Sequence, residues 1–167
     1  VVILKVFIDT DQLFLESGFG AALIQKKNHS YVDECSVFYL NIGVGVLAYG
    51  VMVLSAPWIA GFYDQPLIVP LVRVVGIKLL ISPLVMIQNT VLAKRLEFRL
   101  VAWATVGASV LSGTLGIALA YAGFGVWALA WQQIAAIALL AVFLWVGNPW
   151  RPGATFSFAS IRSLFAY

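Results

Sequence analysis

The sequence has little charge. Only 10% of its 167 residues are Asp, Glu, Lys or Arg, against roughly 25% in a soluble domain. Between Arg99 and Arg151 there is no charged residue across 51 positions. One helix of that length would measure roughly 75 Å, more than twice the roughly 30 Å hydrocarbon core, so the stretch must cross the membrane and fold back. This composition excludes a soluble domain and predicts a multi-pass membrane protein.

Cysteine and histidine are equally scarce, with one residue of each, Cys35 and His29. A single cysteine excludes a disulfide within the chain, and the pair cannot supply a multi-ligand metal site. There is no G-x-S-x-G sequence and no other convergent set of catalytic groups. We therefore expect no metal, no cofactor and no enzymatic activity. The net charge of +3 comes from basic residues in short loops between spans, so nucleic acid is not an expected partner.

Apolar runs separated by polar loops predict an all-α, polytopic transmembrane helix bundle of about five spans, with residues 1–167 forming a single transmembrane region. The predicted spans are 1–24, 36–60, 67–93, 100–122 and 126–147, and a further helix starts near 160–167. Gly123 and Gly125 predict the tight turn between the last two spans. The chain starts and stops inside apolar segments, so we expect it to be part of a longer protein.

Basic residues occur in alternate connections between the predicted spans. They are Lys26, Lys27, Lys94, Arg95, Arg99, Arg151 and Arg162, whereas the intervening connections have no Lys or Arg. By the positive-inside rule, the basic connections are predicted to be cytoplasmic. Tryptophans near the predicted span ends, including Trp58 and Trp150, are expected at the membrane interfaces.

The first predicted span carries polar residues on one helical face. Lys5, Asp9, Gln12 and Glu16 follow at steps of four, three and four, which places them on the same side of a helix. Charges inside a span are costly and normally face a bundle interior or a wet cavity, so this face is a candidate transport site. A soluble or interfacial amphipathic helix is the alternative for this segment.

The third predicted span contains Arg73 and Lys78, and Pro83 is expected to kink it. Lys78 lies near the middle of the span and needs an anion, a carbonyl or water. Ser82 and Asn89 continue this polar face towards the basic loop. The competing interpretation is structural: internal ion pairs could hold the helices in register.

The fourth predicted span has a small residue at every fourth position: Ala104, Ala108, Ser112, Gly116 and Ala120. Small side chains let a second helix approach closely, which favours helix packing in lipid. The alternative is that small residues are simply common in membrane spans.

Several short segments resemble one known family. They are G-F-G-A-A-L-I-Q at 18–25, N-I-G-V-G at 41–45, L-A-K-R-L-E-F at 92–98, G-F-G-V-W-A-L at 123–129 and R-P-G at 151–153. In this order and spacing, the sequence resembles bacterial polysaccharide exporters, and within them the colanic-acid-type branch. The wider superfamily also contains multidrug exporters and the lipid II flippase.

The resemblance implies two halves of about six helices each around a central cavity, with this chain as helices two to six. It implies alternating-access export of an undecaprenyl-pyrophosphate-linked oligosaccharide across the bacterial inner membrane. Lys78 and Arg73 would face the pyrophosphate, and Lys5, Asp9, Gln12 and Glu16 would bind sugar hydroxyls or carry a coupling proton. The implied partners are this substrate, membrane lipid and other polysaccharide-assembly proteins. The alternatives are a multidrug or cation exporter of the same superfamily and a membrane-embedded glycan polymerase or ligase.

Overall fold

The computed structural model describes residues 31–62 and 64–153. They form α3 (Tyr31–Phe62), α4 (Ile68–Val75), α5 (Ile77–Lys94), α6 (Phe98–Tyr121) and α7 (Val126–Gly147). The predicted span 1–24 and the predicted helix start at 160–167 lie outside these residues. Within the described ranges there is no strand. Four stretches are long and apolar enough to cross a membrane, with α4 and α5 together making one of them. The predicted all-α, multi-pass membrane fold is confirmed.

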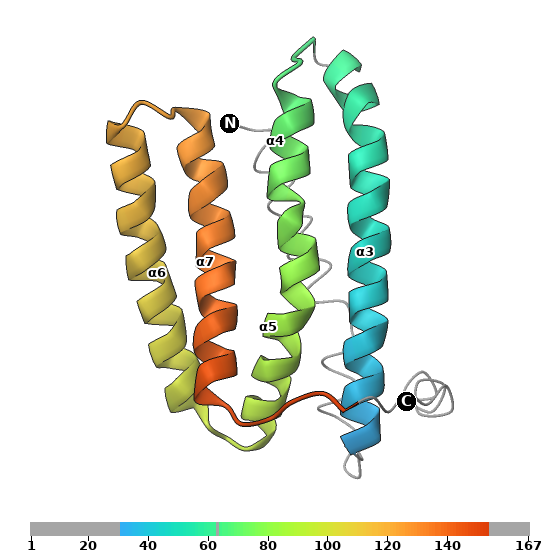
Figure 1. Ribbon diagram of the computed structural model, residues 1–167, viewed down its shortest axis with the longest axis vertical. Coiled ribbons are helices and arrows are strands. Elements are labelled where there is room, and N and C mark those ends of the chain that lie inside the picture. The colour runs from blue at the N-terminus through green and yellow to red at the C-terminus, as the bar shows by residue number, and fades with distance from the viewer. Residues whose placement is uncertain (1–30, 63, 154–167) are drawn as a thin grey trace.

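The helices form a layer that is one helix thick. Figure 1 shows α6, α7, the α4–α5 pair and α3 side by side, and the same neighbours are in contact. Successive spans are antiparallel, so one end of the layer collects the start of α3, the end of α5, the start of α6 and the end of α7. Since Lys94, Arg95, Arg99 and Arg151 lie there, we call it the basic end.

The first helix of the layer begins earlier than the predicted span at 36–60. It starts at Tyr31 and carries Asp33 and Glu34 in its first turn. Carboxylates are favourable at a helix N-terminus because they oppose the positive end of the helix dipole. The predicted span starts at residue 36 because it covers only the charge-free run after Asp33 and Glu34. It therefore leaves out the polar first turn of the helix.

The turn between α6 and α7 depends on left-handed glycines. Gly123 has a φ of 83° and Gly125 a φ of 54°. The Gly123 N–H donates to Ala120 O at 3.1 Å, and the Phe124 N–H donates to Leu119 O at 3.1 Å. These two bonds form a Schellman motif, in which glycine is the residue that adopts positive φ without a steric penalty.

The third span is interrupted at Gly76, between α4 and α5. α5 continues through Pro83, and the kink expected there stays a prediction. The Gly76 N–H still bonds Val72 O at 2.8 Å, but the next bond runs from Leu79 N to Gly76 O at 2.9 Å, a tighter three-residue step. A Cβ on Gly76 would lie 3.0 Å from the Tyr49 ring. The joint therefore lies where α3 approaches α4 closely.

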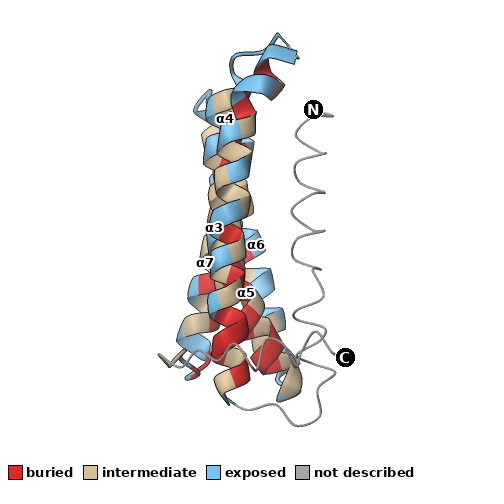
Figure 2. Ribbon diagram, turned by 90° about the vertical axis from the view of Figure 1, so that its right-hand side faces the viewer, coloured by how far each residue is buried: buried red, intermediate tan, exposed pale blue. Residues whose placement is uncertain are grey.

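Buried residues gather towards the basic end, as Figure 2 shows. One apolar cluster there joins α3 and α5 to the segment after α7, and consists of Cys35, Val37, Phe38, Ile87, Val91 and Trp150. A second cluster joins α5, α6 and α7, and consists of Val85, Leu92, Ala104, Ala141 and Leu144. The layer is therefore most tightly packed at its basic end.

Candidate functional site

Lys78 lies at the joint of the third span. It is the second residue of α5, two positions after Gly76, and its span is Ile68–Lys94. Its partly buried Nζ donates a hydrogen bond to Oε1 of Gln133 on α7, at 3.2 Å. The contact fixes a cation between α5 and α7 inside a membrane span.

Arg73 does not share this position. It is exposed on α4, and its backbone carbonyl accepts a hydrogen bond from the Tyr49 hydroxyl at 3.3 Å. Gly76 keeps helical torsions, with φ −60° and ψ −19°. A step of five residues along a helix therefore turns by roughly 140°. Arg73 and Lys78 face different directions from the same span.

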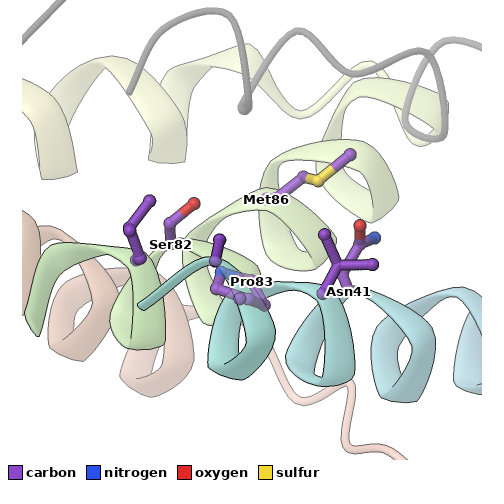
Figure 3. Close-up of a pocket in the computed structure, with 8 residues that line it drawn as sticks. Asn41, Ser82, Pro83 and Met86 are labelled. Carbon is purple, nitrogen blue, oxygen red and sulfur yellow. The ribbon is translucent and has the colours of Figure 1, made fainter. Parts of the chain in front are cut away.

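A small groove between α3 and α5 adds neutral polar groups to the Lys78 side. Its volume is about 30 Å³, and it is lined by Asn41, Val44, Gly45, Ala48, Leu79, Ser82, Pro83 and Met86. In Figure 3 the Asn41 amide and the Ser82 hydroxyl point to the same side of the two helices. Ser82 is one helical turn from Lys78 and so shares its face. This volume is large enough for a water molecule, and the lining offers polar partners for it.

Asn89 extends the same face of α5. It follows Ser82 by seven residues, which returns it to the same side of the helix. Its side-chain oxygen is buried and has no hydrogen-bond partner among the described residues. An unpaired carbonyl oxygen is costly in a membrane span. Lys78, Ser82, Asn89, Asn41 and Gln133 are called the polar face below. Asn41 and Gln133 were not predicted as site residues. The available signal was an amide within a charge-free span, which is Asn41 in one span and the pair Gln132 and Gln133 in another.

The other predicted site residues cannot be placed against this face. Lys5, Asp9, Gln12 and Glu16 lie outside the described residues. In the part of the chain that is described, no three His, Cys, Asp or Glu side chains lie together as a metal site. The prediction of a cofactor-free protein stays a prediction.

The small residues of α6 lie against α7. The buried residues of α6 are Ala104, Ala108, Ser112 and Gly116, whereas Ala120 is exposed. A Cβ on Gly116 would lie 2.9 Å from Cδ of Gln132 on α7. The stripe therefore faces α7 from Ala104 to Gly116, and Ala120 lies beyond the buried contact.

The basic end holds a polar network that includes Trp150. Trp150 is only 6% exposed, so its ring packs against protein, and its predicted depth at the membrane interface stays a prediction. Its Nε1–H donates to Oε2 of Glu34 on α3 at 2.7 Å. The other carboxylate oxygen of Glu34 lies 4.0 Å from Nζ of Lys94 at the end of α5. The segment after α7 is therefore tied to both α3 and α5.

Two buried amides complete this network. Gln88 of α5 is fully buried. Its Oε1 accepts from Nδ2 of Asn148 at 2.7 Å, and its Nε2 donates to Trp150 O at 3.4 Å. Asn148 Oδ1 accepts from the Trp150 N–H at 3.2 Å. We call Glu34, Gln88, Lys94, Asn148 and Trp150 the Trp150 anchor.

Arg151 closes the C-terminal end of α7. Its guanidinium donates to the carbonyls of Asn148, Trp150 and Trp145 at 2.7, 2.8 and 2.8 Å, and lies 5.4 Å from the centre of the Trp145 ring. A cation at this position satisfies carbonyls that have no partner within the helix and opposes its dipole. Arg151 thus has a structural task beyond its contribution to loop charge.

Antiparallel apolar helices with a polar face inside the spans define a multi-pass membrane protein. More narrowly, the chain belongs to the polysaccharide biosynthesis protein family, whose sequence profile matches residues 1–167. The resemblance to polysaccharide exporters is therefore confirmed at the level of the family.

Two relatives come from different bacteria. The chain is 31% identical over 159 residues to the teichuronic acid biosynthesis protein TuaB of Bacillus subtilis (strain 168), which covers 93% of this chain and 33% of that protein. It is 25% identical over 153 residues to the lipopolysaccharide biosynthesis protein WzxC of Escherichia coli (strain K12), covering 87% of this chain and 30% of that protein. The chain thus spans about a third of the length of these relatives. No solved structure matches it.

Proposed function

We propose that this chain is part of a transporter that exports a polysaccharide precursor, an undecaprenyl-pyrophosphate-linked oligosaccharide, across the bacterial inner membrane by alternating access. Family membership supports a role in polysaccharide biosynthesis. The names of the two relatives refer to different envelope polymers, teichuronic acid and lipopolysaccharide. A step that such pathways can share is the passage of a glycan through the membrane. Other polysaccharide-assembly proteins are the expected partners.

The observation that carries the proposal is the position of Lys78. Inserting a lysine in the middle of a span costs about 2.5 to 3.5 kcal/mol on insertion scales. A lysine at this depth is therefore a candidate functional residue. A pyrophosphate head is anionic and cannot cross hydrocarbon unaided. Lys78, held by Gln133, would attract this head, and the oxygens and amides of the polar face would replace water around sugar hydroxyls.

The test uses the full-length protein in cells that depend on it. Lys78→Ala should abolish the appearance of the lipid-linked glycan on the outer leaflet while the folded amount in the membrane stays unchanged. Lys78→Arg should retain part of the transport because the charge survives. Leu80→Ala, an exposed α5 position two residues away, is the control and should transport normally.

The competing account makes Lys78 a structural partner of a carboxylate. Lys78→Ala would then lower the folded amount, and a second change, Asp9→Asn or Glu16→Gln, would restore both folding and export. Recovery of export in such a double mutant would refute substrate contact by Lys78. Glycan polymerisation is assayed separately: loss of polymerisation with intact translocation would favour a polymerase or ligase. Loss of cationic-dye efflux alone would favour a drug exporter.

A further inference from the structure

The loop between α5 and α6 contains a leucine in an unfavourable backbone conformation. Leu96 has a φ of 57°. Its N–H donates to Ala93 O at 3.1 Å, and the Glu97 N–H donates to Leu92 O at 3.0 Å. These are the two bonds of a Schellman motif, the motif that also ends α6. The equivalent position after α6 is glycine, which adopts positive φ freely, whereas Leu96 has a Cβ that is crowded in this conformation.

The described residues give Leu96 no compensating contact. Its side chain is 74% exposed, and Phe98, two positions later, is 57% exposed. Strained residues persist where another interaction favours them, so the conformation indicates a contact that the packing within the layer does not supply. The side chain that benefits is apolar, and so its partner should be apolar as well.

The surroundings of Leu96 indicate which partner this is. One membrane span ends at Lys94 and the next begins at Phe98, so the loop lies at the membrane boundary. Arg95 and Arg99 flank it and are exposed, and Glu97 is its single acidic residue. Exposed arginines next to exposed apolar side chains at this depth are complementary to a phospholipid. Its headgroup carries the phosphate, and its acyl chains extend from there into the bilayer.

We propose that residues 95–99 form a binding site for anionic phospholipid of the surrounding bilayer. Arg95 and Arg99 bind the headgroup phosphates, and Leu96 and Phe98 insert at the level where the acyl chains begin. The left-handed conformation of Leu96 directs an apolar side chain outwards, so that Leu96 and Phe98 are both exposed among the charged residues of this loop. The site is separate from the polar face and does not depend on the proposed transport activity.

The charge contribution is tested with full-length protein in nanodiscs of phosphatidylcholine with increasing phosphatidylglycerol. The midpoint of thermal unfolding of the wild type should rise with the anionic lipid, and this rise should shrink in high salt. Arg95→Gln with Arg99→Gln should weaken the apparent affinity for phosphatidylglycerol by roughly fivefold per arginine. Arg95→Lys with Arg99→Lys should keep most of it. An unchanged phosphatidylglycerol response in the glutamine variant would overturn the proposal.

The apolar contribution is tested with a matched glycine pair. Asp64 lies in the loop before α4, at the opposite end of the layer, and also has positive φ, 51°. Asp64→Gly should raise the unfolding midpoint in bilayers because it only relieves backbone strain. Leu96→Gly should give no rise or a fall, because lost lipid contact offsets the relieved strain. A rise for Leu96→Gly that equals or exceeds that for Asp64→Gly would show that Leu96 is not anchored in lipid.

Discussion

The indole of Trp150 donates a hydrogen bond to the Glu34 carboxylate at 2.7 Å, across 116 positions of sequence. This contact joins the segment after the last described helix to the first turn of α3. Lys94, at the end of α5, lies 4.0 Å from the same carboxylate. Three of the four spans are thus tied together at the basic end by one partly buried acidic residue. Separating them during any movement of the layer would break a partly buried charge pair, which is costly in a poorly hydrated environment.

Trp150→Phe should destabilise the protein although it keeps an aromatic ring in the cluster. The substitution removes the N–H donor and leaves a Glu34 oxygen without that bond. Hydrogen bonds to charged groups contribute about 1.5 to 3 kcal/mol, so we expect a loss of that order in the free energy of unfolding. Unfolding of the full-length protein in detergent measures it. Trp58→Phe is the control, since Trp58 is 82% exposed, and an equal loss there would contradict the role given to Trp150.

The Gln88 and Asn148 side chains should behave as a coupled pair. Gln88→Leu removes the acceptor of the buried Asn148 amide N–H. It should lower the free energy of unfolding by about 1 to 3 kcal/mol, because a buried donor then has no acceptor. Asn148→Leu should cost a similar amount for the same reason. The double substitution should cost less than the sum of the two, as expected for residues that share a hydrogen bond. Strict additivity of the two losses in a double-mutant cycle would mean that the hydrogen bond between the two side chains does not contribute to stability.

The sequence predicts those features that depend on local pattern. The charge-free stretch after Arg99 and the glycines at 123 and 125 indicate an apolar hairpin, and small residues at every fourth position indicate one packed face. The Trp150 anchor could not be predicted, because its contacts join residues roughly 60 to 116 positions apart and its members resemble ordinary loop and cap residues.

The candidate site was predicted only in part for a similar reason. Lys78 is visible in the sequence because a charge in an apolar span is rare. Gln133 is not, since an amide within a span has many possible neighbours until the packing of α5 on α7 is known. The sequence predicts a kink at Pro83, because proline lacks the N–H of a regular helix, and it gives no signal for the interruption at Gly76. In the structure the absence of that donor is accommodated by the close approach of Gly45.

The side of the membrane that the loops face can be tested directly. The positive-inside rule predicts that the basic end faces the cytoplasm. Single cysteines at Asp64 and Glu97, both exposed, lie at opposite ends of the layer and leave the basic residues intact. A membrane-impermeant thiol reagent applied to intact cells should label Asp64→Cys, and should label Glu97→Cys only after permeabilisation. Labelling of both from outside would contradict the topology.

Gly116→Leu should loosen the contact between α6 and α7. Even a Cβ at this position would lie 2.9 Å from the Gln132 side chain, so a leucine must displace that side chain and overpack the contact, at a cost of about 1 to 3 kcal/mol. Gly113→Leu is the matched control, because a Cβ at Gly113 has no neighbour within 4 Å. The folded yield and unfolding midpoint should fall for Gly116→Leu alone. Equal stability of the two variants would indicate that the stripe does not pack.

Two glycines of α3 should respond to alanine with opposite signs. A Cβ on Gly45 would lie 2.6 Å from the Leu79 carbonyl oxygen. That oxygen has no hydrogen-bond donor four residues on, because the residue there is Pro83. Because Pro83 has no N–H to bond the Leu79 carbonyl oxygen, space is left next to that oxygen, and the backbone of Gly45 lies there. The polar groove beside it, lined by Asn41 and Ser82, depends on the same close approach.

Gly45→Ala should therefore push α3 away from α5 and lower the free energy of unfolding by about 1 to 3 kcal/mol, the usual cost of overpacking. Gly43→Ala should instead be stabilising by up to about 1 kcal/mol, because alanine favours a helix over glycine and a Cβ there has no neighbour within 4 Å. Both variants add the same methyl group to the same helix, so the difference isolates the contact with Leu79. If both alanines stabilise the full-length protein in detergent, the close approach at Pro83 does not contribute to the packing of these spans.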